Sequence, residues 1–365
     1  MEKFIPKRKI RVFVFGPSGP DEGGGISSSV NQLLFSNTGD FDVIPVNTIR
    51  RNRASVVAFF RAFVVALLTA SRARFSDEID VLFHFNISKD GSCIRKLTLS
   101  LIARMFSIPH VYLIHSGGFP EFVKSLPPFF FTFLTKAFER ANGVGCVSVF
   151  VMRQLVEILP SLGGKIVFLP NGSTLSGNYP KKSKSANVEV AFVGPTTLAK
   201  GFDLYKELAT NLNKLGLDSL RFNVLGASSP EIESTCPANM IFHGHLRHDV
   251  AVEVLSRCSY LVITSRVEAM PMVAIESMQL GVPIVSSMVG DMPFLLQQGK
   301  LGTLFETGNG ESCLAAFLAL RDRLADGSDV ANRAYESWRI SYTAQKMTDR
   351  LCGYWSDALV PQAQK

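Results

Sequence analysis

Short apolar runs alternate with helical segments along most of this chain. The first series of candidate strands covers Ile10–Phe15, Val43–Val46, Val81–Phe85, Val111–His115, Val144–Val147 and Ile166–Leu169. The second series covers Val188–Val193, Arg221–Leu225, Met240–His243, Tyr260–Thr264 and Pro283–Ser286. Apolar strands that alternate with helices indicate parallel sheets covered on both faces. The pattern therefore predicts an α/β protein with two doubly wound, Rossmann-like domains.

A polar and basic stretch, residues 177–187, separates the two series and is typical of a linker. We therefore expect an N-terminal domain at residues 1–180 and a C-terminal domain at residues 181–340. The last segment, residues 341–365, has a helical pattern. A doubly wound domain binds its ligand at the carboxyl ends of its strands. Two such domains that face one another would enclose a cleft.

The composition narrows the class of partner. A net charge of +7 favours anionic ligands such as nucleotide diphosphates, anionic lipid or nucleic acid. No zinc-finger or RNA-recognition motif favours nucleic acid. The six cysteines are scattered without a Cys-x-x-Cys pair, which suits a reducing cytoplasm better than a disulfide framework. The first residues lead into a strand without a signal-peptide core, so we expect a cytoplasmic protein.

The most specific pattern is a pair of carboxylates eight residues apart. Glu268 follows the strand Tyr260–Thr264, and Glu276 lies about two turns into the next helix. Pro271 suits the first turn of that helix and Gly281 its C-terminal cap. The free amides at a helix N-terminus favour an anion such as a sugar diphosphate. Without this context, two isolated glutamates would be read as exposed surface residues.

At these residues the chain resembles the retaining glycosyltransferases of family 4, which carry a Glu-x7-Glu signature in a GT-B fold. The resemblance implies that Glu268 contacts the donor sugar and that Glu276 contacts the nucleotide ribose. It also implies donor binding by the residues that open the helix, Met270, Met272 and Val273. The resemblance also implies that the domain at residues 1–180 binds the acceptor and that the domain at residues 181–340 binds the nucleotide sugar. In the resembled fold the C-terminal helix crosses back onto the first domain.

The second domain opens with a segment that resembles the family's Gly-Arg-x-x-x-x-Lys-Gly signature. It runs from Gly194 to Lys200 and the following glycine, and Lys200 matches the lysine that neutralises the leaving diphosphate. The arginine position holds Pro195, which brings neither charge nor donor. Arg266, two residues before Glu268, is the candidate substitute. The resemblance implies that Lys200 and Glu268 are catalytic and that Gly194 and Arg266 bind the donor.

Two features of the first domain point to the same chemistry. A glycine-rich loop follows the first strand, and glycines let the backbone approach a ligand closely. It matches neither Gly-x-Gly-x-x-Gly nor a Walker loop, and a plain turn is the alternative. His115 ends a strand shortly before two glycines, a position at the crevice of a parallel sheet. The alternative is a hydrogen-bonded structural histidine. In family 4 enzymes a glycine-rich loop at this place approaches the donor phosphates, which implies donor binding by Gly24 and Gly25. The Gly91–Lys96 and His115–Phe119 segments resemble bacterial exopolysaccharide glycosyltransferases, which implies that His115 is a catalytic residue near the transferring sugar.

No metal site is expected. His243, His245 and His248 lie close in sequence, but a zinc site needs three or four converging ligands and no cysteine or carboxylate pattern supports one. The Asp40-Phe-Asp42 triplet precedes a strand and is interpreted as a turn. The resembled fold generally stabilises the leaving group without metal. We therefore expect no cofactor and a nucleotide-diphosphate sugar as the substrate.

Apolar segments in the first domain suggest a membrane contact. Val56–Ala70 is strongly apolar but too short for a spanning helix, and Arg50, Arg51 and Arg53 precede it. A basic cluster beside an apolar helix docks on anionic membranes. The alternative is a buried helix. Leu126–Leu134 is also strongly apolar. It is either the start of a core helix or an exposed apolar segment that faces lipid.

These features together predict a glycosyltransferase that moves a sugar from a nucleotide-sugar donor to a glycan or lipid-linked saccharide acceptor. The resemblance implies retention of configuration and a role in bacterial surface polysaccharide biosynthesis, at the inner face of the cytoplasmic membrane. A nucleotide-sugar epimerase on the same fold is one alternative. A non-catalytic GT-B partner subunit, suggested by Pro195, is the other.

Overall fold

The computed structural model describes residues 9–17, 24–48, 55–75, 80–175 and 188–360. The chain forms two compact units, one of Met1–Gly172 with Ala344–Lys365 and the other of Ser173–Thr343. The first boundary thus falls before the polar stretch at 177–187, which lies outside the described residues. The second boundary falls three residues after the expected position, and the final helix belongs to the first unit.

The first unit is built on a parallel sheet in the order β2-β1-β3-β4-β5-β6. Its strands are β1 (Ile10–Gly16), β2 (Phe41–Asn47), β3 (Val81–Ile87), β4 (His110–Ile114), β5 (Gly143–Cys146) and β6 (Ile166–Phe168). Every residue of β3 is buried, which explains its nearly continuous apolar sequence. Two polar residues interrupt that run, His84 and Asn86, and both are needed at the end of the strand, as described below.

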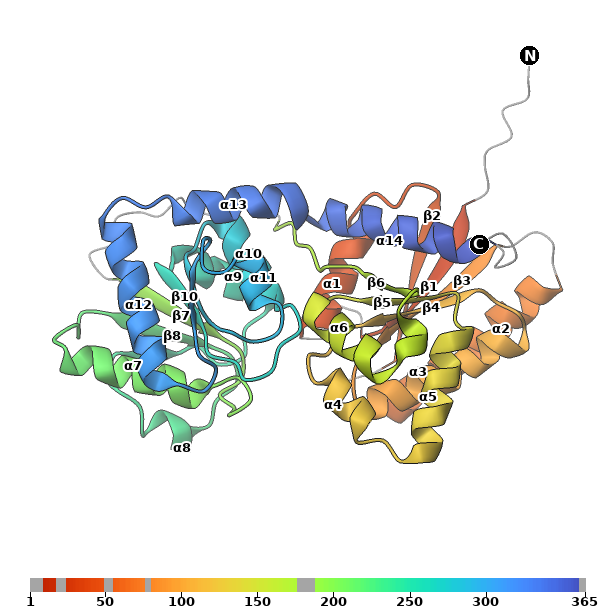
Figure 1. Ribbon diagram of the computed structural model, residues 1–365, viewed down its shortest axis with the longest axis horizontal. Coiled ribbons are helices and arrows are strands. Elements are labelled where there is room, and N and C mark those ends of the chain that lie inside the picture. The colour runs from red at the N-terminus through yellow and green to blue at the C-terminus, as the bar shows by residue number, and fades with distance from the viewer. Residues whose placement is uncertain (1–8, 18–23, 49–54, 76–79, 176–187, 361–365) are drawn as a thin grey trace, which may run out of the picture. The chain divides into compact units, whose positions relative to one another are not determined.

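Helices cover both faces of this sheet. Figure 1 shows α1 (Gly25–Leu34) and α14 (Ala344–Leu359) together on one face, and α2 (Ser55–Arg74), α3 (Gly91–Met105) and α5 (Pro128–Arg140) on the other. The unit also contains α4 (Phe119–Lys124), α6 (Val149–Ile158) and the 3-10 helix η1 (Pro160–Leu162).

Aromatic side chains fix α14 to the sheet. The Tyr354 hydroxyl donates to the Tyr112 carbonyl over 2.9 Å, and Trp355 is fully buried. A Cβ at Gly143 would lie only 2.6 Å from the Tyr354 ring, so this strand position accepts only glycine without repacking.

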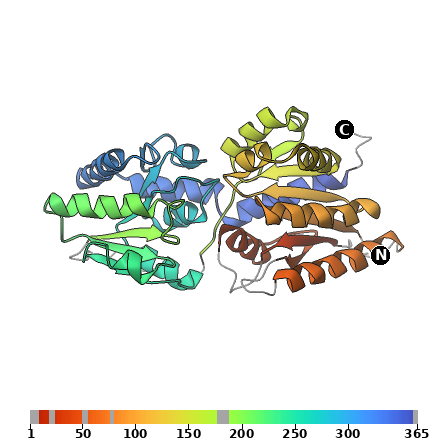
Figure 2. The same cartoon turned by 90° about the horizontal axis from the view of Figure 1, so that it is seen from below.

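The second unit has its own parallel sheet, in the order β12-β11-β10-β7-β8-β9. Its strands are β7 (Glu189–Val193), β8 (Arg221–Leu225), β9 (Met240–Phe242), β10 (Tyr260–Ile263), β11 (Ile284–Ser287) and β12 (Thr303–Phe305). Its helices are α7 (Phe202–Lys214), α8 (Pro230–Glu233), α9 (His248–Arg257), α10 (Met272–Leu280), α11 (Met292–Leu295), α12 (Gly310–Ala325) and α13 (Val330–Ser341). Figure 2 shows helices on both sides of each sheet.

The fold class predicted from the sequence is confirmed. Every expected strand is present within two residues of its expected bounds. The edge strand β12 is an addition, because its three residues carry too short an apolar run to be recognised. In the second unit the core beneath the sheet is aromatic, with the Tyr205 and Phe192 rings 5.2 Å apart.

Candidate functional site

Two backbones approach closely where β7 and β10 end in the second unit. Gly201 has a φ of 69°, and a Cβ there would lie 1.9 Å from the Thr264 carbonyl oxygen. The Thr264 hydroxyl donates to the Lys200 carbonyl over 3.1 Å. The Arg266 amide donates to the Ala199 carbonyl over 2.9 Å. These contacts hold the loop that carries Lys200 against the end of β10.

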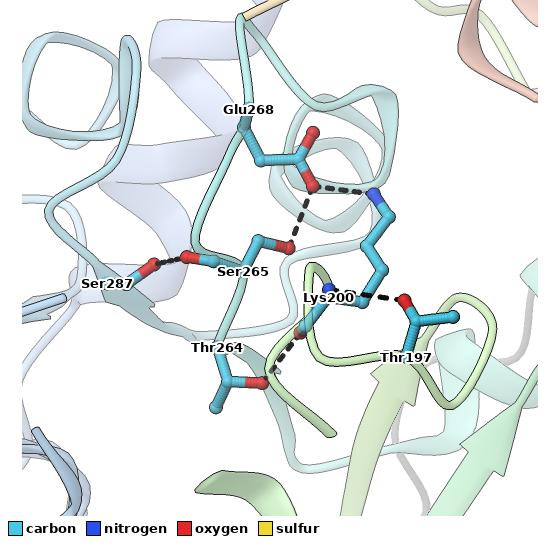
Figure 3. Close-up of polar contacts among 6 residues, drawn as sticks. All are labelled: Thr197, Lys200, Thr264, Ser265, Glu268 and Ser287. Atoms are coloured by element: carbon cyan, nitrogen blue, oxygen red, sulfur yellow. Dashed lines mark hydrogen bonds and ion pairs between the residues drawn. The ribbon is translucent and has the colours of Figure 1, made fainter. Parts of the chain in front are cut away.

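This loop brings two of the candidate catalytic residues together (Figure 3). The Lys200 Nζ lies 2.6 Å from Glu268 Oε1, although 68 positions separate the residues. The Ser265 hydroxyl donates to the same oxygen over 2.8 Å. The Glu268 side chain is 13% exposed and that of Lys200 36%, so the carboxylate is the more deeply held partner. The short distance and partial burial make this a stronger ion pair than an exposed one.

The loop after β11 fixes the backbone at Glu268. Gly290 has a φ of 52°, and a Cβ there would lie 2.3 Å from the Glu268 carbonyl oxygen. The Asp291 amide donates to the Ala269 carbonyl over 2.8 Å. The Ser287 hydroxyl donates to the Ser265 carbonyl over 2.6 Å. The sequence analysis did not identify these supports, because they come from the end of β11 and the loop after it, which are distant in the sequence from Glu268.

A small cavity adjoins the ion pair. Its lining consists of strand ends and of Lys200, Thr264, Ser265, Glu268 and Val273. Of these lining residues, Lys200 carries the positive charge and Glu268 the negative charge. The residue after Gly194 is Pro195, whose side chain carries no charge.

Other candidate donor-binding residues surround this cavity. Gly194 has a φ of 142°, and a Cβ there would meet the Lys200 side chain at 3.5 Å. Helix α10 begins at Met272, with Pro271 at its N-cap, so the proline lies one position earlier than expected. Met270 and Met272 are buried, so their side chains are not exposed to a ligand.

Arg266 has other partners within the second unit. Its guanidinium makes a two-pronged contact with the Asp203 carboxylate, at 2.7 and 2.6 Å, and also donates to the Leu198 carbonyl. This contact lowers the pKa of Asp203. Arg266 therefore fastens the Lys200 loop to helix α7, and it is not among the residues that line the cavity.

Glu276 is buried in helix α10 and pairs with a histidine. His248 Nε2 lies 2.7 Å from Glu276 Oε1. Hydrogen bonding to this carboxylate, opposed by desolvation, raises the pKa of His248. The sequence analysis considered His248 only as a metal ligand and did not anticipate this pair. Among the described residues, no group of three or more His, Cys, Asp and Glu side chains could hold a metal ion.

The first unit contains a separate polar network at the ends of β3 and β4. The Trp355 indole N–H donates to His84 Nδ1 over 2.9 Å. An indole N–H can only donate, so His84 carries its proton on Nε2. His84 Nε2 lies 3.2 Å from Asn86 Oδ1, and His115 Nε2 lies 2.7 Å from the same oxygen. The indole thus fixes both histidines as Nε2–H donors and leaves the Nδ1 lone pair of His115 unprotonated.

Burial keeps this network neutral. Desolvation is the main cause that lowers the pKa of His115 to about 3, and the nearby His84 and Lys96 act in the same direction. The fully buried Lys96 donates to the Ser92 hydroxyl, and desolvation lowers its pKa to about 7. The Gly91–Lys96 segment forms the beginning of α3, because the helix begins at Gly91.

The glycine-rich loop begins beside this network. A Cβ at Gly16 would lie 3.1 Å from the Asn86 side chain. Gly24 is the N-cap of α1, with a φ of 117°, and Gly25 is the first residue of that helix. Residues 18–23 lie outside the described residues.

Acid should destabilise the first unit. Burial lowers the pKa of His84 and of His110 to about 4, whereas both would take up protons near pH 6.5 in the unfolded chain. The unfolded state then binds more protons below pH 6.5, so the free energy of unfolding falls by up to about 1.4 kcal/mol per pH unit for each histidine. We expect amide hydrogen exchange in β3 and β4, measured relative to the intrinsic exchange rate at each pH, to accelerate between pH 6.5 and 4.5.

The second unit provides an internal control for that experiment. The raised pKa of His248 means that the folded state holds its proton more tightly, so the His248–Glu276 pair stabilises the fold below pH 6.5 and loses this effect as the pH rises. Exchange in α9 and α10 should therefore not accelerate over the same acid range. Equal acceleration in both units would contradict the assignment.

Residues 187–323 match the family model described as Glycosyl transferases group 1. The second unit contains a glycosyl transferases group 1 domain. The Lys200–Glu268 pair and Glu276 all lie inside this glycosyl transferases group 1 domain.

Curated relatives agree with this assignment. An uncharacterized glycosyltransferase of Methanocaldococcus jannaschii is 25% identical over 241 residues, which cover 64% of this chain and 63% of the relative. The sulfoquinovosyl transferase of Arabidopsis thaliana is 28% identical over 50% of this chain and 36% of the relative. An uncharacterized protein in the cps region of Klebsiella pneumoniae is 20% identical over 78% of this chain and 84% of the relative. The chain thus spans less than two thirds of the first two relatives.

Solved structures share the fold along nearly the whole chain. Sucrose-phosphate synthase from Thermosynechococcus elongatus has a TM-score of 0.74 and 16% identity, covering 95% of this chain and 98% of its own. HepE from Anabaena, solved in complex with UDP and glucose, has a TM-score of 0.67 and 14% identity, covering 94% and 99%. These similarities show a GT-B fold.

Proposed function

We propose that this protein transfers a sugar from a nucleoside-diphosphate sugar to a glycan or lipid-linked saccharide acceptor, with retention of anomeric configuration. The observation that carries the proposal is the Lys200–Glu268–Ser265 cluster at the ends of β7 and β10, inside a glycosyl transferases group 1 domain. The Lys200 ammonium suits the diphosphate of such a donor, and the Glu268 carboxylate suits the hydroxyls of its sugar.

In this proposal Lys200 stabilises the departing diphosphate. Negative charge grows on that group in the transition state, and a cation already in place lowers its energy without reorganisation. Glu268 would accept hydrogen bonds from donor-sugar hydroxyls while Ser265 keeps it oriented. Because Lys200 and Glu268 are paired before the donor binds, the donor would insert between charges that are already aligned.

Glu276 would bind the nucleotide ribose through its carboxylate. The residue lies on α10 behind the cluster and is held by His248. A buried carboxylate with one oxygen committed to an imidazole retains lone pairs for ribose hydroxyls. The relatives are consistent with a nucleotide donor, since HepE was solved with UDP and glucose.

Glu276→Gln should weaken binding of the donor nucleotide by about tenfold or more, because a hydrogen bond to a charged group contributes about 1.5–3 kcal/mol. Calorimetry with the nucleotide selected from a thermal-shift panel of UDP, GDP, ADP and CMP would measure this. Glu253→Gln, on the exposed face of the neighbouring helix α9, is the matched control and should bind normally. Equal affinities for both variants would exclude the ribose role.

An assay with and without acceptor separates the candidate activities. Sugar transfer only in the presence of a glycan or lipid-linked acceptor, with an anomer matching the donor, supports the proposal. Isomerisation of the sugar by the protein alone would identify an epimerase. We place the enzyme in the cytoplasm, in bacterial surface polysaccharide synthesis, a role in keeping with the Klebsiella relative from a cps region.

A further inference from the structure

Helix α2 has an unusual distribution of apolar side chains. Its buried stripe consists of small residues, Ala58, Ala62, Ala66 and Ala70. Five of its large apolar residues are each at least 50% exposed, namely Val56, Val57, Phe60, Val64 and Leu68, and the other four are half-buried, namely Phe59, Phe63, Val65 and Leu67. These small residues suit the side of α2 that packs against its neighbours α3 and β2, where the buried alanines lie. A helix that only covered a sheet would place its large side chains inward.

The same exposed apolar character continues across the adjacent helices. Helix α3 packs between α2 and α5 on this side of the sheet. On α3 the exposed residues Ile94, Leu101 and Met105 recur with helical spacing and form one stripe. On α5 the exposed large apolar residues are Phe129 and Phe130. We call the exposed large apolar residues of α2, α3 and α5 the apolar face. Contiguous apolar surface of this kind marks an interaction site.

The charges on these helices identify the partner. Together α2, α3 and α5 carry seven basic residues that are at least partly exposed, namely Arg61, Arg72, Arg74, Arg95, Arg104, Lys136 and Arg140. They carry one acidic residue, Glu139. An apolar surface with a strongly basic surround fits a partner that is apolar and anionic at once, which describes the interface of an anionic lipid bilayer.

We propose that the apolar face docks on an anionic lipid bilayer, with α2 lying in the plane of the interface. Val56–Arg74 is long and apolar enough to span a membrane, but its alanine stripe is committed to the first unit and Arg61 lies within it. An in-plane position keeps the alanines on α3 and the large side chains in lipid. A second copy of the chain is a poor occupant, because paired faces would oppose arginine to arginine.

Docking would give the proposed transfer direct access to a lipid-linked acceptor, so the inference extends the proposed function. It does not depend on transfer, because vesicle binding is measured without donor or acceptor. The arginines at 50, 51 and 53, which the sequence suggested as the basic anchor, lie outside the described residues. The described helices supply enough basic charge without them.

Flotation of the full chain with vesicles tests the proposal. Vesicles of phosphatidylcholine with phosphatidylglycerol should carry the protein, and phosphatidylcholine alone should carry much less. The double variant Phe60→Ser with Leu68→Ser should bind about tenfold or more weakly, because both side chains lose apolar burial in lipid. Arg61→Gln with Arg74→Gln should weaken binding about tenfold or more, and salt should weaken wild-type binding.

Phe35→Ser is the matched control. Phe35 is 93% exposed but caps α1 on the opposite face of the sheet, so this variant should float like wild type. All the substituted side chains are exposed, and an unchanged nucleotide-induced thermal shift would confirm folding. Equal flotation of the Phe60/Leu68 variant and the control would overturn the proposal. A dimer in light scattering that only this variant dissociates, without vesicle binding, would assign the face to self-association instead. Absence of any sugar transfer would refute the proposed function and leave the flotation result standing.

Discussion

Lys200→Met is expected to lower kcat by about 10²–10³-fold, the usual cost of removing one preorganised group from a developing oxyanion. Among the residues lining the cavity beside Glu268, Lys200 carries the positive charge, and Arg266 is bound to Asp203. Methionine keeps most of the apolar stem, which lies against Gly194. The fold should survive, because Glu268 keeps its hydrogen bond from Ser265. Single-turnover kinetics with a saturating donor would measure the effect.

Lys206→Met provides the control for this prediction. Lys206 lies on α7 of the same unit, with its Nζ 2.8 Å from the Thr235 hydroxyl, and it does not line the cavity. Its loss should leave kcat within about twofold of wild type, as for an ordinary surface substitution. If Lys200→Met kept wild-type turnover, another cation would have to stabilise the leaving group. The double variant with Arg266→Met would then test whether Arg266 moves away from Asp203 during the reaction.

Asn86→Leu is expected to destabilise the protein by about 1–3 kcal/mol, since it leaves the buried His84 N–H without an acceptor. His84 and His115 both contact the Asn86 oxygen, and leucine offers no acceptor. Loss of that oxygen also frees the imidazole of His115 to rotate. If this histidine contacts the transferring sugar, transfer should fall by about tenfold or more, as positioned acid–base groups contribute at least that much. Denaturant unfolding and steady-state kinetics would measure the two effects.

Asn86→Asp separates positioning from folding. It keeps an acceptor for both histidines, so much of the stability should return. Its buried negative charge should raise the pKa of His115, which lies low in the wild-type protein. The acid limb of the pH–rate profile should then move to higher pH, which a purely structural role would not produce. Asn37→Leu, at an exposed turn of the same unit, should change neither quantity. An unshifted acid limb in an active Asn86→Asp variant would remove His115 from the reaction.

The spacing of apolar residues and glycines along the sequence was sufficient to predict much of the fold. Strands such as β7 and β10 carry their own apolar runs, and Gly281 ends α10 in a left-handed conformation with a φ of 64°, as its sequence position indicated. The edge strand β12 was missed because its three residues pair on one side only, with β11, and need no long apolar run. For α2 the sequence left two alternatives, an exposed and a buried apolar helix, since hydropathy does not tell which side of such a helix meets the sheet.

The sequence by itself determined the parallel α/β architecture, the Glu268–Glu276 spacing and the glycine beside Lys200, because each depends on residues within a few turns of one another. Only the tertiary structure decided the partners of these groups. Lys200 meets Glu268 across 68 positions, and Trp355 reaches His84 across 271. The direction of Arg266 toward Asp203 and the pairing of His248 with Glu276 belong to the same class. The physical reason is that a parallel sheet gathers the carboxyl ends of strands that are distant in sequence, and a side chain's partner there depends on which strand is its neighbour.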